Sequence, residues 1–449
     1  MTMQHDRRGL PQSAASAAAM QAFDATVEAY MAFERQTGER LKETLGLDPS
    51  MPMALCLKGC FLLLFCKRAL VPPAAKALAA AREAANERAV SPREMHHMEA
   101  LQHWLDGDLQ AAAARWDSIL IDHPHDLIAL RMAHYLHFYL GDAAALRNSV
   151  ARPLHAWSDA VPGYGYVLGI KAFALEECGD YAAAEREGRA AIERNRADIW
   201  AAHAVAHVME MRDRPEEGIA WIGGLEDAWG GCHNFTYHVH WHRCLFRLEL
   251  GDHDGVLQDY DTRVRADHSD EFLDVINAVA LLWRLEQRGV DVGDRWEELS
   301  QVCRDLSEDH RMVFGDAHYI MALAAGGDTA AIETALASLQ HFAEGHGSEE
   351  AVARAIALPL ARAAVAHRQG RFGAAIEALL PHRAALHRLG GSRAQRDLFE
   401  QLLIDAALKD GRSALAKALL SERGLQRPGN PWNAAMEQAA REAAPLQSA

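Results

Sequence analysis

Hydrophobic residues recur along most of this chain at steps of three and four, with charged and polar residues between them. This spacing places the apolar side chains on one face of an α-helix. Alternating runs of β-branched residues, which would predict strands, are almost absent, and alanine, leucine, glutamate and arginine dominate. We therefore expect an all-α fold.

Gly-Asp pairs mark the boundaries between the predicted helices. Glycine ends a helix by adopting a left-handed conformation, and aspartate caps the start of the next helix. The first two pairs are 34 residues apart, the period of the helix–turn–helix tetratricopeptide repeat. The pairs are Gly107-Asp108, Gly141-Asp142, Gly179-Asp180, Gly251-Asp252 and Gly327-Asp328, and we place Asp213 and Gly289 at degenerate copies of the same turn.

The segment 93–126 matches this repeat best. Ala100 and Ala112 occupy the small positions where two helices cross, and Pro124 closes the unit. We expect a tetratricopeptide-like superhelix, an α-solenoid, that forms one continuous array of about eight helix pairs. Its predicted parts are a mobile tail over 1–17, an N-terminal helical cap over 18–92, the helix pairs over 93–425 and a C-terminal extension over 426–449.

Composition narrows the choice of partners. The 449 residues carry a net charge of −16 without a basic block, which argues against sequence-independent binding to the phosphate backbone of nucleic acids. The most apolar stretch, 51–71, is interrupted by Lys58, Lys67 and Arg68, so we expect a buried helix and no membrane contact. Seven cysteines without a CxxC pair, and a start without a signal-peptide pattern, predict a cytoplasmic protein. Homo-oligomerisation stays open.

Several strings in the chain resemble the tetratricopeptide repeat protein 38 family and its bacterial relatives, over roughly residues 25–425. The most specific is Gly390–Asp397 followed by Gln401–Ile404, in register with His203–Met211. The other matching strings are Asp122–Pro124, Phe138–Gly141, Ser149–Arg152 and Phe314–His318. The resemblance implies a cytosolic helical-repeat protein and carries no settled reaction with it.

Histidine is unusually frequent, with 24 residues in the chain. His203, His207 and Glu210 are spaced i, i+4 and i+7, which puts them on one face of a predicted helix. The first helix of each tetratricopeptide pair lines the concave groove, so we expect these side chains to face a ligand. Matching positions in other repeats extend the predicted ligand-binding set to His97, His238, Trp241, His242, Asp316, His318 and Arg396.

Three kinds of chemistry are open to this cluster. The two imidazoles and the carboxylate of His203, His207 and Glu210 suit a divalent metal ion such as zinc, iron or manganese. Alternatively, a histidine oriented by a carboxylate acts as acid or base without a metal and activates water, a substrate or Cys232 beside His233.

The third interpretation is a recognition groove, in which Trp241, Tyr237 and Phe314 add apolar contacts to the polar hydrogen bonds. For any single histidine, and above all for His134, a hydrogen-bonded packing role competes with these functions. Ser392 follows two glycines but lacks the strand–turn–helix setting of a serine nucleophile. We expect the protein to bind a small molecule or a peptide in a concave, histidine-rich pocket. The alternative is an enzyme of hydrolase or lyase type, metal-assisted or histidine-based, that uses the same pocket.

Overall fold

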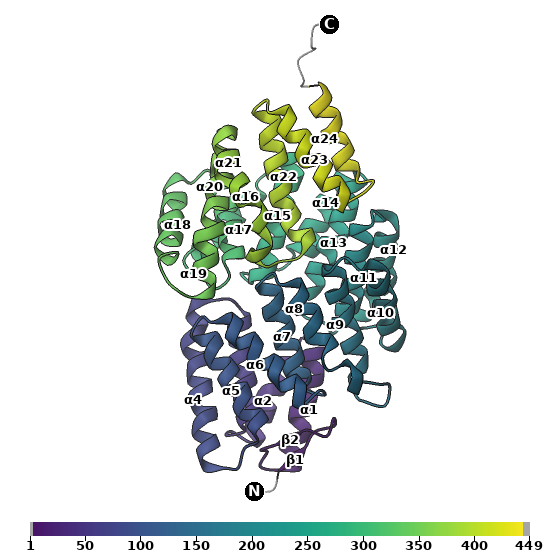
Figure 1. The fold of residues 1–449 in the computed structure, drawn as a ribbon, viewed down its shortest axis with the longest axis vertical. Helices are drawn as coiled ribbons and strands as arrows, with labels where there is room; N and C mark the ends of the chain where they lie inside the picture. Colours follow the sequence, from purple (N-terminus) through teal and green to yellow (C-terminus); the bar gives the residue numbers. More distant parts are fainter. Residues whose placement is uncertain (1–2, 443–449) are drawn as a thin grey trace. The chain divides into compact units, whose positions relative to one another are not determined.

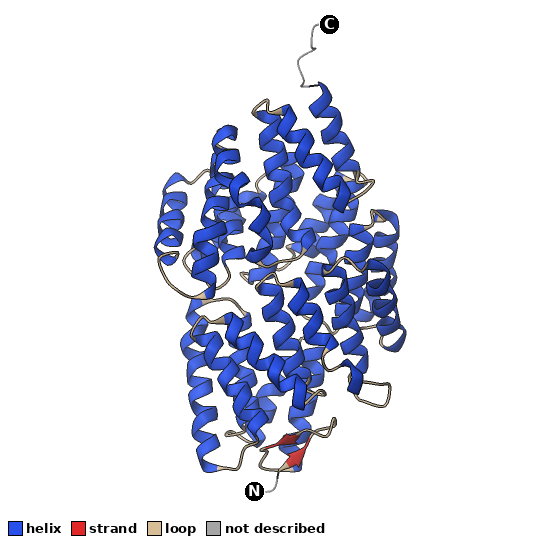
Figure 2. Ribbon diagram, viewed as in Figure 1, coloured by secondary structure: helices blue, strands red, loops and turns tan. Residues whose placement is uncertain are grey.

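The computed structural model describes residues 3–442, and the chain over these residues is almost entirely helical (Figure 2). Within these residues, β1 (Gln4–His5) and β2 (Pro11–Gln12) form one short antiparallel pair of strands. The predicted all-α, helical-repeat fold is confirmed. Across the described residues, no helix has both the length and the apolar character needed to cross a membrane.

The Gly-Asp pairs form the predicted turns between helices. All five glycines adopt a left-handed conformation, with φ between 65° and 82°. Each following aspartate accepts a hydrogen bond on its side chain from the backbone N–H three residues later and so caps the next helix. The two degenerate positions, Asp213 and Gly289, also have positive φ, at 53° and 75°. The Gly-Asp pairs therefore determine where these helices end and begin.

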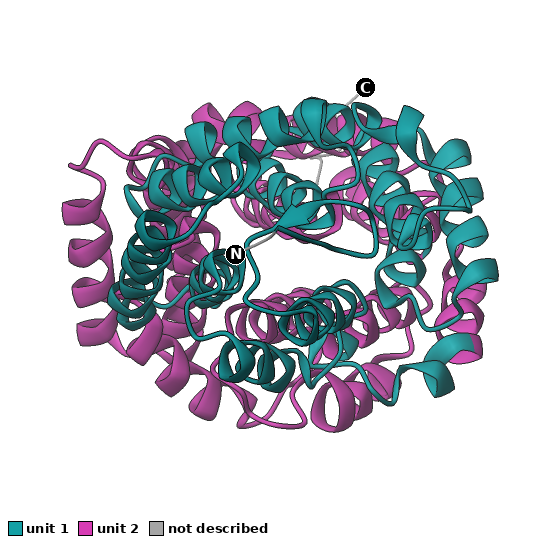
Figure 3. Cartoon of the chain, turned by 90° about the horizontal axis from the view of Figure 1, so that it is seen from below, with its two compact units in different colours: residues 1–205, 225–236 teal, residues 206–224, 237–449 magenta. Residues whose placement is uncertain are grey.

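Contacts divide the chain into two compact units, shown in teal and magenta in Figure 3. Unit 1 consists of Met1–Val205 and Leu225–Thr236, and unit 2 of Ala206–Gly224 and Tyr237–Ala449. The boundaries fall inside α11 (Ile199–Met211), α12 (Pro215–Leu225) and α13 (Phe235–Glu249). This division differs from the single continuous array that the repeat predicts.

Unit 1 brings its first and last segments together. The backbone N–H of Arg35 donates to the carbonyl of Gly231 at 3.0 Å, and the Arg35 side chain bonds the carbonyl of Cys232 at 3.2 Å. An open array would join only neighbouring repeats. The helices of this unit (Figure 1) are α1 (Ala17–Met31), α2 (Thr37–Leu47), α3 (Pro52–Leu64), α4 (Val71–Glu87), α5 (Pro92–Leu105), α6 (Leu109–Asp122), α7 (Leu127–Tyr139), α8 (Ala143–Ala151), α9 (Tyr164–Glu177) and α10 (Tyr181–Arg194), with 3-10 turns Arg68–Leu70, Leu154–Ala156 and Glu226–Trp229.

The N-terminal segment is folded, contrary to the predicted mobile tail over 1–17. The Arg8 guanidinium is buried and contacts the carboxylates of Asp6 at 3.1 Å and Asp24 at 3.4 Å. Ser13 bonds the carboxylate of Glu94, which lies 81 positions later in the chain. These contacts with α1 and α5 hold residues 3–17 in place, and short-range sequence patterns do not reveal them. Residues 1–2 lie outside the described part.

Unit 2 also closes on itself. Arg427 donates to the carboxylate of Glu210 at 3.0 Å, and Asn430 donates to Glu249 at 2.8 Å, across 217 and 181 positions of sequence. Its further helices are α14 (His253–Asp259), α15 (Phe272–Gln287), α16 (Arg295–Leu306), α17 (Val313–Gly326), α18 (Thr329–Phe342), α19 (Ser348–Val352), α20 (Leu358–Arg368), α21 (Phe372–Leu379), α22 (Arg393–Lys409), α23 (Ser413–Gln426) and α24 (Pro431–Glu442), with π-helical turns Tyr260–Val264 and Ala353–Ala357 and the 3-10 segment Leu380–Leu389. The predicted extension over 426–449 thus contains α24, and residues 443–449 lie outside the described part.

Candidate histidine centre

Three imidazoles of unit 2 lie close together. His207 comes from α11, and His238 and His242 lie one turn apart on α13, so that both face the same side of that helix. One ligand atom of each lies within 4.8 Å of those of the other two. The ring centroids of His207 and His242 are 4.3 Å apart, and those of His238 and His242 are 4.9 Å apart. All three side chains are buried.

Two of these imidazoles are oriented by hydrogen bonds from Nδ1 to oxygen atoms of other residues. Nδ1 of His242 lies 3.0 Å from a carboxylate oxygen of Glu210, and Nδ1 of His238 lies 3.2 Å from the amide oxygen of Asn277. Because these oxygens only accept hydrogen bonds, each Nδ1 carries the proton and donates it. The lone pair of each ring is therefore on Nε2, the nitrogen through which such a tautomer coordinates a metal ion.

An ionic chain continues outward from Glu210. One of its oxygens accepts from His242, and the other accepts from Arg427 at 3.0 Å. Arg427 also donates to Asp397 at 2.9 Å, and Arg423 donates to both oxygens of Asp397 at 2.8 Å. Burial alone would raise the pKa of Asp397, but the two guanidinium groups hold it well below its usual range. Glu210, predicted as a metal ligand, is thus a support behind His242.

Burial keeps the three imidazoles neutral. It lowers the pKa of His207 and His238 well below the usual value, and the neighbouring His242 adds to the effect on both. For His242 burial acts together with Arg284 and Arg427 and lowers the pKa to about 3. The contact between His242 and Glu210 is therefore a hydrogen bond from a neutral ring rather than an ion pair at neutral pH. Neutral imidazole is the form that coordinates metal ions.

The remaining predicted residues on α11, α5 and α13 have local partners. His203 lies one turn before His207, in unit 1, where its ring stacks on Phe173 with 5.4 Å between centroids. His97 has both ring nitrogens engaged, by Asp126 at 2.9 Å and by the indole N–H of Trp116 at 3.1 Å, so its role is in packing.

The ring of Trp241 stacks on His238 at 5.4 Å and carries the Arg284 guanidinium on its face at 5.6 Å. Trp241 therefore packs directly against the cluster of three imidazoles. Burial lowers the pKa of His318 to about 4, and the same Arg284 adds a smaller effect in that direction.

Three further predicted residues are engaged elsewhere in unit 2. Asp316 bonds His310 at 3.1 Å, His318 donates to the carbonyl of Phe314 at 2.8 Å, and Arg396 donates to the carbonyls of Gly390 and Gly391. Over residues 3–442, none of Asp316, His318 and Arg396 belongs to a close group of metal-ligating side chains. The spacing of the repeats alone does not bring them to the three imidazoles.

The candidate nucleophiles have structural roles. Burial raises the pKa of Cys232 to about 11, so its thiol is a poor nucleophile at neutral pH, and burial lowers that of His233 to about 4. Ser392 is the N-cap of α22 and forms a capping box with Gln395. Neither Cys232 nor Ser392 therefore supports nucleophilic chemistry.

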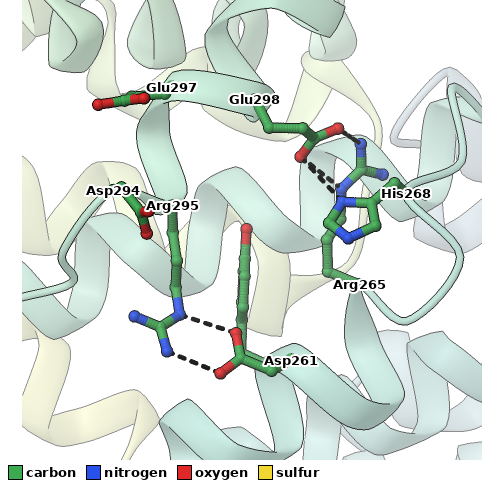
Figure 4. A pocket seen from close by; sticks show the side chains of 8 residues that line it. Asp261, Arg265, His268, Asp294, Arg295, Glu297 and Glu298 are labelled. Carbon is green, nitrogen blue, oxygen red and sulfur yellow. Dashed lines mark hydrogen bonds and ion pairs between the residues drawn. The ribbon is translucent and has the colours of Figure 1, made fainter.

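A polar cleft of about 440 Å³ lies apart from these residues, at Tyr260–Val264 and α16 (Figure 4). Its two arginines are already paired, Arg295 with Asp261 at 2.7 Å and Arg265 with Glu298 at 2.7 Å. The cleft therefore offers an incoming ligand no uncompensated positive charge, and none of the predicted site residues lines it.

Sequence reasoning missed Asn277, Arg427 and Asp397. Arg427 lies 217 positions after Glu210, and no spacing rule connects two residues that far apart. Asn277 offers a weak signal, because it is a polar residue between the apolar residues Ile276 and Ala278 of α15.

No family model matches the chain, so its resemblance to the tetratricopeptide repeat protein 38 family stays a prediction. A solved structure described as Naa15/Naa10 bound to HypK-THB is similar, with 12% identity and a TM-score of 0.26. The similarity covers 95% of this chain and 65% of that chain. At this level the likeness carries no conclusion about function.

Proposed function

We propose that this protein is a helical-repeat binding protein whose unit 2 holds a divalent transition metal ion on His207, His238 and His242. One observation carries the proposal: three neutral imidazoles converge within 4.8 Å, and two of them donate Nδ1–H to an outer oxygen. Metal-binding histidines characteristically make this second hydrogen bond, which fixes the tautomer and the ring orientation. Nitrogen ligands of this kind suit zinc and its neighbours in the first transition row.

Burial of the cluster favours an ion or a small polar molecule over a peptide. The side chains of His207 and His242 have no exposed surface, and His238 retains 4%. A peptide needs an accessible groove with main-chain and side-chain contacts. An ion needs only its ligands and an entry path, so the enclosed position supports metal binding as the function of this site.

The enzyme alternative would use the same three imidazoles but finds less support. Acid–base chemistry with Glu210 as the base requires a carboxylate oxygen directed at the reacting group. Both oxygens of Glu210 are engaged by His242 and Arg427 instead. A metal-assisted hydrolase remains the second candidate, because a metal ion on imidazole ligands lowers the pKa of bound water.

The proposal is tested by measuring metal content and binding. Protein purified without a histidine tag is analysed by elemental mass spectrometry, stripped with a chelator and titrated with Zn²⁺ and Co²⁺. We expect one ion per chain, a Co²⁺ visible spectrum typical of nitrogen ligation, and a higher melting temperature with metal. Saturation at about 100 times the dissociation constant adds about 2.7 kcal/mol to stability.

Variants on α13 provide a matched comparison. His238→Ala and His242→Ala should lose the ion, whereas His240→Ala, which removes a buried imidazole between them on the same helix, should keep it. His203→Ala reports whether the imidazole one turn before His207 contributes. Equal metal content in all four variants, or no binding by the wild-type protein, would refute the proposal.

A further inference from the structure

A second unusual group lies in unit 1, on α7. The Arg131 side chain is 1% exposed, and none of its three guanidinium nitrogens has a hydrogen-bond partner among the described residues. Arginine stays protonated in proteins, and buried charges are normally paired with a carboxylate or hydrogen-bonded throughout. Arg131 therefore differs from Arg93, equally buried in the same unit, which pairs with Asp126 at 2.6 Å.

Three aromatic rings surround the guanidinium of Arg131. Its central carbon lies 5.1 Å from the ring centre of Phe33, 5.5 Å from that of Tyr135 and 5.0 Å from that of Trp200. Cation–π contacts favour the charge, but they satisfy none of its N–H donors. The N–H donors at the in-plane edge, through which arginine bonds carboxylates, have no partner among the described residues.

The backbone at Phe33 is held in a strained conformation that completes this set of rings. Phe33 has φ of 57°, a left-handed value that a bulky residue rarely adopts. The contact between its carbonyl and the N–H of His233, at 2.8 Å, fixes it there. The ring then stacks on Trp200, with 5.7 Å between centroids. Such strain is typical of functional sites.

Other polar atoms next to these rings are buried without a hydrogen-bond partner in the described chain. They include both ring nitrogens of His134, the indole N–H of Trp200 and the hydroxyl of Tyr30. The ring of His134 lies 5.7 Å from Trp200. Burial raises the pKa of the Tyr30 hydroxyl, and Tyr135 and Arg131 act on it as well. Native proteins leave few buried polar groups unsatisfied, so several around one guanidinium call for a further partner such as a bound ligand or water.

We propose that Arg131 binds the carboxylate of a small organic acid, whose apolar or aromatic part packs against Phe33, Tyr135 and Trp200. A planar carboxylate matches the guanidinium edge with two parallel hydrogen bonds. One guanidinium balances the single negative charge of a carboxylate and leaves the second charge of a phosphate uncompensated. The residues that carry this proposal all belong to unit 1.

Benzoate and its neutral isostere benzamide test this site on the full-length protein. Benzoate should raise the melting temperature in a concentration-dependent way and change the fluorescence of Trp200, which lies next to the guanidinium. Benzamide should bind about 10-fold to 100-fold more weakly, because it lacks the charge-assisted pair with Arg131. Inorganic phosphate serves as the third probe and should bind more weakly than benzoate.

Arg131→Met separates a ligand-binding role from a structural one. It keeps a long side chain between the rings but removes the charge, so the ligand-free variant should be at least as stable as the wild type and show no benzoate response. The fluorescence change should also disappear in Trp200→Phe. This variant therefore shows whether benzoate binds next to Trp200, even if Arg131→Met does not fold. The proposal is overturned if benzoate and benzamide act equally, if wild-type protein ignores benzoate, or if Arg131→Met keeps the response.

Discussion

Replacing Glu210 by glutamine tests the support behind His242. The carboxylate accepts two buried hydrogen bonds, from Nδ1–H of His242 at 3.0 Å and from the Arg427 guanidinium at 3.0 Å. Glutamine has nearly the same shape but only one accepting oxygen, and its amide nitrogen is a donor. Whichever way the amide turns, one of the two donors meets another donor, and Arg427 loses one of its two carboxylate partners.

The expected cost follows from this geometry. Breaking a buried ion pair by removing one partner typically costs about 3–5 kcal/mol. Arg427 keeps Asp397 at 2.9 Å, so we expect the lower end, about 3 kcal/mol. For a unit of this size that corresponds to a fall in melting temperature of about 6–12 °C. Loss of the hydrogen bond behind His242 should in addition weaken metal affinity about 10-fold to 100-fold.

Both effects are measured on purified protein, stability by thermal and urea unfolding without metal and affinity by titration with Zn²⁺ against a competing chelator. Glu422→Gln is the matched control, because Glu422 pairs with Arg383 on the surface of the same unit, where its side chain is 57% exposed. An exposed pair contributes about 0–1 kcal/mol. If Glu210→Gln melts within about 2 °C of the control, the carboxylate does not bridge two buried donors and the reasoning fails.

Two further predictions concern pH and packing. The folded-state pKa of His242, about 3, is below its ordinary value of 6.5, so the stability that the neutral ring contributes is present above pH 6.5 and is lost as pH falls toward 3. Urea unfolding of metal-free protein over this window gives the free energy of unfolding at each pH. Its slope against pH should be shallower in His242→Phe than in the wild type, by about 1.4 kcal/mol per pH unit. Equal slopes would mean that the ring is not buried in its neutral form. Ala112 and Ala184 are fully buried at helix crossings, so leucine at either position should cost about 1–3 kcal/mol in the free energy of unfolding. The exposed neighbour Ala182 should accept leucine without loss, and unchanged melting of both buried-site variants would show that the repeat register is wrong.

The helices and their turns were predictable because they depend on local chemistry. A glycine in the left-handed region followed by an aspartate that caps the next helix needs only neighbouring residues, and Gly179 with Asp180 illustrates it, at φ of 82° and with a bond to the N–H of Ala183. The spacing of His203, His207 and Glu210 similarly fixes their shared helix face. That two histidines of α13 come close to His207 follows from helix packing between repeats, which the period describes only approximately.

The closure of each unit was not predictable from the repeat. A tetratricopeptide period specifies how neighbouring helix pairs stack but says nothing about contacts between distant repeats. The bonds from Arg427 to Glu210 in unit 2 and from Arg35 to Cys232 in unit 1 join segments about two hundred residues apart. The unpaired guanidinium of Arg131 was equally hidden, because nothing in the sequence around position 131 distinguishes it from a paired arginine such as Arg93.

Closure also links the proposed metal centre to the folding of unit 2. The imidazole of His242 is held by Glu210, which is held by Arg427, and Arg427 reaches that position only when the segment after α23 has returned to α11. An ion that binds the oriented imidazoles more tightly than the disordered ones must therefore favour the closed unit by the same free energy. By linkage, closing the unit must raise the affinity for the ion. Residues as far apart as Glu210 and Arg427 thus act on one site because both belong to the same closed unit.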